Sequence, residues 1–397
     1  MKSRFAHVAK IVVSNILVFI MLVVLIEFFA SRAVSLPSEN LIESWTFNHT
    51  WKPNSSYEHR EWIATNPDFP DPYVHTYNRQ GWVEAYDIAE AKPNNVYRIF
   101  YLGDSFVEGT APMSQSMPSL VEQQLNEQSK ADGLTFEVIN TGTASYSPLI
   151  YFVLTQHLIK SYEPDLIVVN VDMTDNFDEV KYRETAVYDA SGNPTAVPPR
   201  NLYEAEFVDT PTGAVASSPL LRLQLFLWQR SYFYNWMWQT MQPFRPNTEP
   251  TDNPDLVLER WAWCEAEWDL ATEADVAAML DVLARLVTVA EKAEVKLMLT
   301  AVPHYPQFPN TNPEGGSRCA SPEPHFALAA FAAELDVPYL NSYAALEPHI
   351  QATSQTEFYY YGDMHFNPRG YALWANAQLA FLRDPANQLL PSTTHNN

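Results

Sequence analysis

The chain has 397 residues, of which 47% are hydrophobic, and it carries a formal net charge of −23 at pH 7. This length and apolar content suffice for one large core or two ordinary ones, which excludes a chain that is disordered over most of its length. Residues 1–35 contain four bases and one acid, so residues 36–397 carry a charge of −26. So acidic a domain repels nucleic acid and anionic lipid, and we expect neither as its partner.

The N-terminus predicts a membrane anchor. Lys2, Arg4 and Lys10 precede a nearly uncharged run over residues 11–30, long enough to cross a bilayer core of about 30 Å as a helix. We expect the basic flank to stay cytoplasmic and the chain after about residue 35 to be periplasmic or extracellular. A cleaved signal peptide is the alternative, and it exports the same chain. Glu27 interrupts the run near its outer end, where a carboxylate reaches the headgroups.

Residues 36–95 are rich in Pro, Asn and Trp and predict an extended lead-in. Beyond them, apolar runs typical of buried parallel strands lie at 96–103, 136–142, 165–172, 295–303 and, more weakly, 337–342. Helical patterns alternate with them at 116–129, 147–162, 272–294, 323–335 and 367–382. This alternation predicts a three-layer α/β/α doubly wound parallel sheet, flavodoxin-like, over residues 96–390.

The segment Lys181 to Thr272 breaks the alternation, and we interpret it as an insertion. It holds six of the eleven tryptophans of the chain: Trp228, Trp236, Trp238, Trp261, Trp263 and Trp268. They form either the core of an inserted subdomain or a lid that contacts substrate. The two cysteines, Cys264 and Cys319, are expected to pair if the chain is exported. No zinc-ligand spacing or phosphate-binding glycine loop occurs, so we expect no metal and no cofactor.

Candidate catalytic residues stand at the two ends of the predicted domain. Ser105 follows the first strand in a Gly-Asp-Ser sequence, where a serine is either a turn residue or a nucleophile. Asp363 and His365 precede a helix start near the C-terminus. A nucleophilic serine needs an imidazole to remove its proton, and the imidazole needs a carboxylate to fix its tautomer. The chain supplies all three groups. The Gly-Asp-Ser turn and the Asp363–His365 pair each also have a purely structural interpretation.

Several blocks of the sequence resemble the SGNH/GDSL hydrolase superfamily. FYLGDSFVEGT (100–110) resembles its first block, and YGDMHFNPRGY (361–371) resembles its last block, in the same order. Between them, VINTGTASYSP (138–148) resembles the block that supplies an oxyanion glycine, and residues 164–179 stand where the family has its Gly-x-Asn-Asp block. YNRQGWV (77–83) resembles a lead-in of membrane-anchored members.

The resemblance implies a role for each matching residue. Ser105 would be the nucleophile, His365 the base and Asp363 the residue that orients it. The backbone N–H groups of Ser105 and Gly142 would form the oxyanion hole. Aligning on the acid of the third block places Thr174 where the family has its oxyanion asparagine, whereas Asn176 matches only after a shift of two residues. Both therefore stay candidates for the third donor.

These expectations combine into one functional hypothesis with two alternatives. The chain is interpreted as an extracytoplasmic, membrane-anchored serine esterase that acts on O-acyl groups of a cell-envelope carbohydrate or of a lipid. An O-acyltransferase of envelope polysaccharide would use the same Ser105, Asp363 and His365 but pass the acyl group to a sugar hydroxyl. A non-catalytic envelope-binding module would keep the fold alone.

Overall fold

A computed structural model gives the fold of the chain. It describes residues 2–32, 41–59, 73–130, 133–199, 227, 231–241, 260–309, 311, 317–350 and 353–391. The chain forms two compact units, one of Met1–Glu39 with Tyr203–Asp252 and one of Asn40–Leu202 with Asn253–Asn397. The second, larger unit contains Ser105, Asp363 and His365.

A five-stranded parallel sheet forms the centre of the larger unit. Its strands are β5 (Val96–Leu102), β6 (Thr135–Asn140), β7 (Leu166–Val171), β10 (Lys296–Ala301) and β11 (Tyr339–Leu340), in the order β11-β10-β7-β5-β6. In chain order β5 is the first strand of this sheet, and it lies between the second, β6, and the third, β7. This is the flavodoxin-like order, in which the chain changes direction across the sheet at the first strand and ligands bind beyond its carboxyl end. The predicted doubly wound sheet is confirmed.

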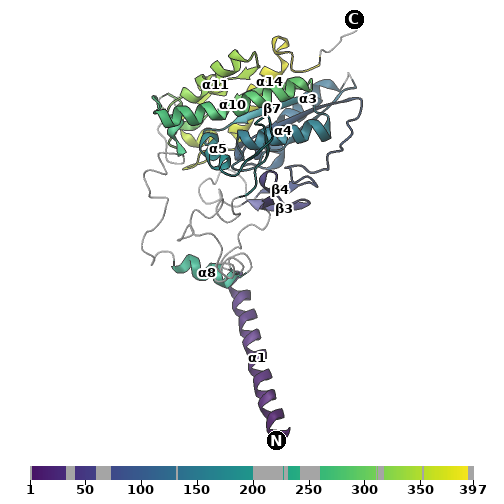
Figure 1. Cartoon of the computed structure of the whole chain (residues 1–397), viewed down its shortest axis with the longest axis vertical. Coiled ribbons are helices and arrows are strands. Elements are labelled where there is room, and N and C mark those ends of the chain that lie inside the picture. Colours follow the sequence, from purple (N-terminus) through teal and green to yellow (C-terminus); the bar gives the residue numbers. More distant parts are fainter. Residues whose placement is uncertain are drawn as a thin grey trace. The chain divides into compact units, whose positions relative to one another are not determined.

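Helices cover both faces of this sheet (Figure 1). Phe100 and Leu102 of β5 pack in one core and Ile99 and Tyr101 in the other, as the two-residue period of a strand requires. Helices α4 (Pro148–Tyr162), α10 (Leu270–Lys292) and α11 (Glu323–Glu334) contribute to the first core. Helices α3 (Met117–Ser129), α12 (Ser342–Ile350) and α14 (Pro368–Arg383) contribute to the second. The predicted three-layer arrangement is therefore confirmed.

Short helices connect these elements at the edges of the sheet. They are the α-helices α2 (Ser105–Glu108), α5 (Asp175–Arg183) and α13 (Gln355–Phe358) and the 3₁₀ helices η1 (Met113–Gln115), η4 (Ala262–Cys264), η5 (Tyr305–Gln307) and η6 (Pro385–Asn387). Helices α2 and α5 follow β5 and β7 directly, so both begin at the carboxyl edge of the sheet.

The described part of the lead-in, residues 41–59 and 73–95, contains two antiparallel strand pairs within the larger unit. Strand β1 (Leu41–Ser44) pairs with β2 (Asn48–Trp51), and β3 (Ser55–His59) pairs with β4 (Tyr73–Tyr77). The buried rings of Trp51 and Tyr77 stack with their centroids 4.5 Å apart. The lead-in is thus a packed part of the larger unit, because its aromatic side chains form a small core of their own.

The predicted insertion is described only in part. It contains the hairpin β8 (Val187–Tyr188) and β9 (Pro194–Ala196), whereas Trp228 and the side chain of Trp238 lie outside the described residues. Trp261 and Trp263 are buried in the core on the α10 side of the sheet, and Trp263 Nε1 donates to the Met173 carbonyl at 2.6 Å. Cys264 and Cys319 form a disulfide, which confirms the predicted pairing.

The smaller unit contains the apolar N-terminal segment. Helix α1 (Lys2–Ala30) includes Val13–Ala30, which among the described residues is the one stretch long and apolar enough to cross a membrane, as a signal sequence also is. Glu27 accepts hydrogen bonds from Ser231 Oγ and from the Phe233 N–H at the start of helix α8 (Tyr232–Met241). An acid in the apolar run is therefore explained, because Glu27 caps the N-terminus of α8.

Candidate active site

Ser105 is the first residue of α2, immediately beyond the carboxyl end of β5. The buried Asp104 caps this helix, since its Oδ1 accepts the Phe106 N–H at 2.9 Å. A Cβ on Gly103 would lie 2.2 Å from Cγ2 of Val107, so only glycine lets the strand turn this tightly against the helix. Gly103 and Asp104 thus build the turn, and Ser105 is the residue that the turn presents.

Ser105, His365 and Asp363 form a continuous hydrogen-bonded chain. Ser105 Oγ lies 2.8 Å from His365 Nε2, and His365 Nδ1 lies 2.6 Å from Asp363 Oδ1. Because the carboxylate can only accept at Nδ1, the neutral imidazole turns its lone pair toward the serine hydroxyl. The serine thus follows the first strand of the parallel sheet, and the acid–histidine pair precedes its last helix, as the sequence resemblance to SGNH hydrolases implies.

Neither a protein-family model nor a curated protein matches the sequence. Solved structures do match. They include a two-domain esterase active on acetylated mannans (12% identity, 75% of this chain and 51% of that one, TM-score 0.38). An acetylxylan esterase from Geobacillus stearothermophilus (9% identity, 74% and 96%, 0.37) and a putative lipolytic protein of the G-D-S-L family from Desulfitobacterium hafniense (12%, 72% and 99%, 0.36) also match. The match spans about half the length of the two-domain esterase.

The loop between α13 and α14 holds the acid–histidine pair. The His365 N–H donates to Asp363 Oδ1 at 2.8 Å, and Gln355 Nε2 donates to the Asp363 carbonyl at 2.9 Å. Burial opposes the ionisation of Asp363, but the hydrogen bonds and charge interaction with His365 outweigh it and hold the pKa of Asp363 below its ordinary value. Asp363 is therefore ionised at neutral pH, and its carboxylate accepts the hydrogen bond from His365 Nδ1.

The Gly142 N–H already has an acceptor within the protein. It donates to Asn140 Oδ1 at 3.0 Å, and the oxyanion contact expected from this N–H stays a prediction. A Cβ on Gly142 would lie 2.2 Å from the Glu108 nitrogen, which shows that the glycine is needed for close packing against α2. Ser145, in the same loop, has a left-handed φ of 61° and is exposed. Its N–H donates to no described acceptor.

The two candidates for the third oxyanion donor differ in their hydrogen bonds. Thr174 Oγ1 donates to Asp172 Oδ2 at 2.6 Å, and the Thr174 N–H donates to the same oxygen at 2.8 Å. Asn176 lies in the first turn of α5 with 5% of its surface exposed, and its Nδ2 has no acceptor among the described residues. A buried amide donor without an acceptor is costly. The Asn176 amide is therefore suited to donate a hydrogen bond to a ligand, whereas the Thr174 hydroxyl is suited to a structural role.

Buried acids and a histidine form a network next to Ser105, and no motif in the sequence indicated this histidine, His304. Fully buried His304 contacts Asp172 Oδ1 through Nε2 at 2.8 Å and Ser317 Oγ through Nδ1 at 2.7 Å. Burial opposes the ionisation of Asp172, but the charge and hydrogen bond of His304 and the hydrogen bonds of Thr174 lower its pKa to about 2.

The neighbouring carboxyl groups of this network have the opposite shift. Carboxylate oxygens of Asp104, Asp172 and Asp175 lie within 4.8 Å of one another. Burial, reinforced by the charge of Asp172, raises the pKa of Asp104 and of Asp175 well above the ordinary value. Asp172 is thus the carboxyl group of the three that ionises most readily.

Phe106 links this network to the site, because its ring packs 5.3 Å from His304 and 4.7 Å from His365 between centroids. It lies directly after Ser105 and is fully buried. Its packing limits the movement of the His365 ring beside the serine.

Proposed function

We propose that the chain is a serine ester hydrolase of the SGNH type, with Ser105 as nucleophile, His365 as general base and Asp363 as the residue that orients it. The observation that carries this proposal is the hydrogen-bonded chain from Ser105 through His365 to Asp363. A serine that only caps a helix needs no imidazole nitrogen 2.8 Å from its hydroxyl, contributed by a residue 260 positions away. A nucleophile needs that contact.

The geometry supports the usual two-step acyl transfer. As Ser105 Oγ attacks the ester carbonyl, His365 Nε2 takes the hydroxyl proton, and Asp363 stabilises the resulting imidazolium. His365 then gives the proton to the leaving alcohol, and an acyl-enzyme forms on Ser105. A water molecule activated by the same imidazole attacks this ester, which releases the acid and restores the serine.

The negative charge on the tetrahedral intermediate needs donors at the carboxyl edge of the sheet. Ser105 contributes its backbone N–H at the start of α2. Asn176 Nδ2 is a side-chain donor without an acceptor among the described residues, and the exposed Ser145 N–H in the β6–α4 loop also has no described acceptor. Donors that are already in place stabilise the transition state without reorganisation.

The substrate is an O-acyl ester of cell-envelope carbohydrate or of lipid, hydrolysed outside the cytoplasm by an enzyme anchored through α1. The membrane-length apolar stretch of α1 and its flank of Lys2, Arg4 and Lys10 support this location. The Cys264–Cys319 disulfide supports it independently, because such bonds persist in oxidising compartments. The large negative charge argues against anionic lipid as the ester.

The proposal is tested with full-length protein in detergent, given short-chain and long-chain p-nitrophenyl esters with and without an oligosaccharide acceptor. We expect free acid as the product in both conditions, and no turnover by Ser105→Ala. Transfer of the acyl group to the oligosaccharide would replace the hydrolase by an O-acyltransferase. Wild-type protein without turnover or covalent labelling would leave a binding module as the better account.

A further inference from the structure

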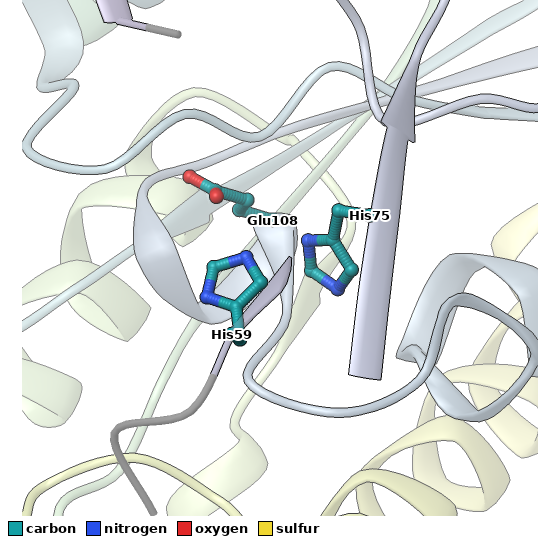
Figure 2. Close-up of side chains that lie close together, drawn as sticks. All are labelled: His59, His75 and Glu108. Atoms are coloured by element: carbon teal, nitrogen blue, oxygen red, sulfur yellow. The ribbon is translucent and has the colours of Figure 1, made fainter. Parts of the chain in front are cut away.

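We propose that His59, His75 and Glu108 form a Zn²⁺ site that joins the lead-in strands to the nucleophile helix. One ligand atom from each of the three side chains lies within 4.8 Å of the other two. Figure 2 shows the two imidazole rings and the carboxyl group drawn together from three separate parts of the chain. The sequence contained no ligand spacing that indicated this site, because the antiparallel strands and α2 bring the three residues together.

The register of β3 and β4 places both histidines on one face of the strand pair. Tyr57 pairs with His75, and His59 pairs with Tyr73, so the two histidines are diagonal neighbours with ring centroids 4.6 Å apart. On β4, His75 is buried between two exposed residues, so its side of the strand faces the interior of the larger unit, to which β4 belongs. Glu108 reaches the same place as the last residue of α2, the helix that begins at Ser105.

The proton positions suit metal binding. His75 Nε2 lies 2.8 Å from the carbonyl oxygen of Ala111, which only accepts, so Nε2 carries the proton and Nδ1 presents its lone pair. A backbone carbonyl on the far nitrogen is the usual arrangement behind a metal-bound imidazole, because it fixes the tautomer and the ring.

The other two ligands are also held in place. The Ala144 N–H donates to Glu108 Oε2 at 2.9 Å, and Tyr77 Oη lies 3.4 Å from Oε1. The ring of Tyr73 stacks on His59 with centroids 4.7 Å apart and planes 15° from parallel. Positioning contacts of this kind prepare a side chain for a ligand before it binds.

The ligand set selects the ion. Two imidazole nitrogens and one carboxylate oxygen form a common Zn²⁺ set with a fourth position for water, whereas Mg²⁺ and Ca²⁺ prefer oxygen ligands alone. Zn²⁺ bonds of about 2.0–2.2 Å require ligand atoms roughly 3.4 Å apart, so small side-chain rotations close the present spacing. Bound Zn²⁺ would fix β3 and β4 against α2 and hence against the turn that presents Ser105.

The experiment uses full-length protein in detergent, stripped with a chelator and titrated with ZnCl₂ by calorimetry, with bound zinc counted by mass spectrometry after desalting. Co²⁺ replaces Zn²⁺ in a parallel titration, because its visible absorption reports tetrahedral coordination. The variants are His59→Ala, at the end of its strand, and Glu108→Gln, which keeps the shape of the buried side chain. His349→Ala, an exposed histidine on α12, is the matched control.

We expect one zinc per chain in the wild type and in His349→Ala, with an affinity at least about tenfold lower in His59→Ala and in Glu108→Gln. The tetrahedral Co²⁺ absorption should disappear in the same two variants. Wild-type protein without stoichiometric zinc would overturn the proposal. Full zinc binding by a folded His59→Ala protein would also overturn it. If Asp175→Asn lost the zinc and His59→Ala kept it, the ion would instead bind at the buried acids next to Ser105, which would overturn the proposal as well.

Discussion

The choice between Thr174 and Asn176 can be decided by two substitutions with opposite expected effects. Asn176→Ala removes an amide whose Nδ2 has no described acceptor, so the free protein loses no hydrogen bond there. We therefore expect its free energy of unfolding to change by no more than about 1 kcal/mol. If the amide binds the oxyanion, kcat should fall by about 10²–10³, which corresponds to about 2.7–4 kcal/mol of lost transition-state stabilisation.

Thr174→Val is the matched substitution, because it replaces the hydroxyl by a methyl group of similar size. It removes the 2.6 Å hydrogen bond to Asp172 Oδ2, and the loss of such a bond to a charged group costs roughly 1.5–3 kcal/mol of stability. Its kcat should stay near the wild-type value. Urea unfolding gives the stability of both variants, and steady-state hydrolysis of p-nitrophenyl acetate gives kcat. A large loss of kcat in a folded Thr174→Val protein with normal turnover in Asn176→Ala would refute this assignment.

Three further predictions concern the framework of the site. Replacing Cys264 and Cys319 by serine should lower the free energy of unfolding by up to about 4 kcal/mol, because the disulfide closes a loop of 55 residues; unchanged urea unfolding would contradict this. Gly142→Ala should destabilise the protein by about 3 kcal/mol or more, since the added Cβ meets the Glu108 nitrogen at 2.2 Å; a wild-type melting curve would show that the loop can relax. Burial raises the pKa of the Glu179 carboxyl from 4.5 to about 7, so the folded state binds the carboxyl proton more tightly than the unfolded state does. The stability that this proton contributes is fully present below pH 4.5 and is lost as the pH rises through 7. Glu179→Gln should therefore flatten the stability profile between pH 4 and 8 by about 3 kcal/mol relative to wild type, and an unchanged slope in urea titrations would exclude Glu179 as its source.

The sequence predicted the sheet well, because its strands are continuous apolar runs separated by helical patterns, as buried parallel strands require. It also predicted Ser105, Asp363 and His365, since each stands at a junction of strand or helix that a motif marks. It could not show that the Gly142 N–H is bonded to Asn140, because a motif does not reveal which acceptor a backbone N–H has. It gave no indication of His304 or of the His59, His75 and Glu108 cluster, because tertiary contacts alone bring those residues together.

Covalent labelling of the serine tests the central claim most directly. Full-length wild type, Ser105→Ala and His365→Ala, each shown to be folded by circular dichroism, are treated with a fluorophosphonate, and the modified peptide is found by mass spectrometry. We predict a label on Ser105 of the wild type, none in Ser105→Ala and a rate of labelling lower by orders of magnitude in His365→Ala, because the imidazole must remove the hydroxyl proton. A folded Ser105→Ala protein that is still labelled, or that hydrolyses esters at the wild-type rate, would contradict the account.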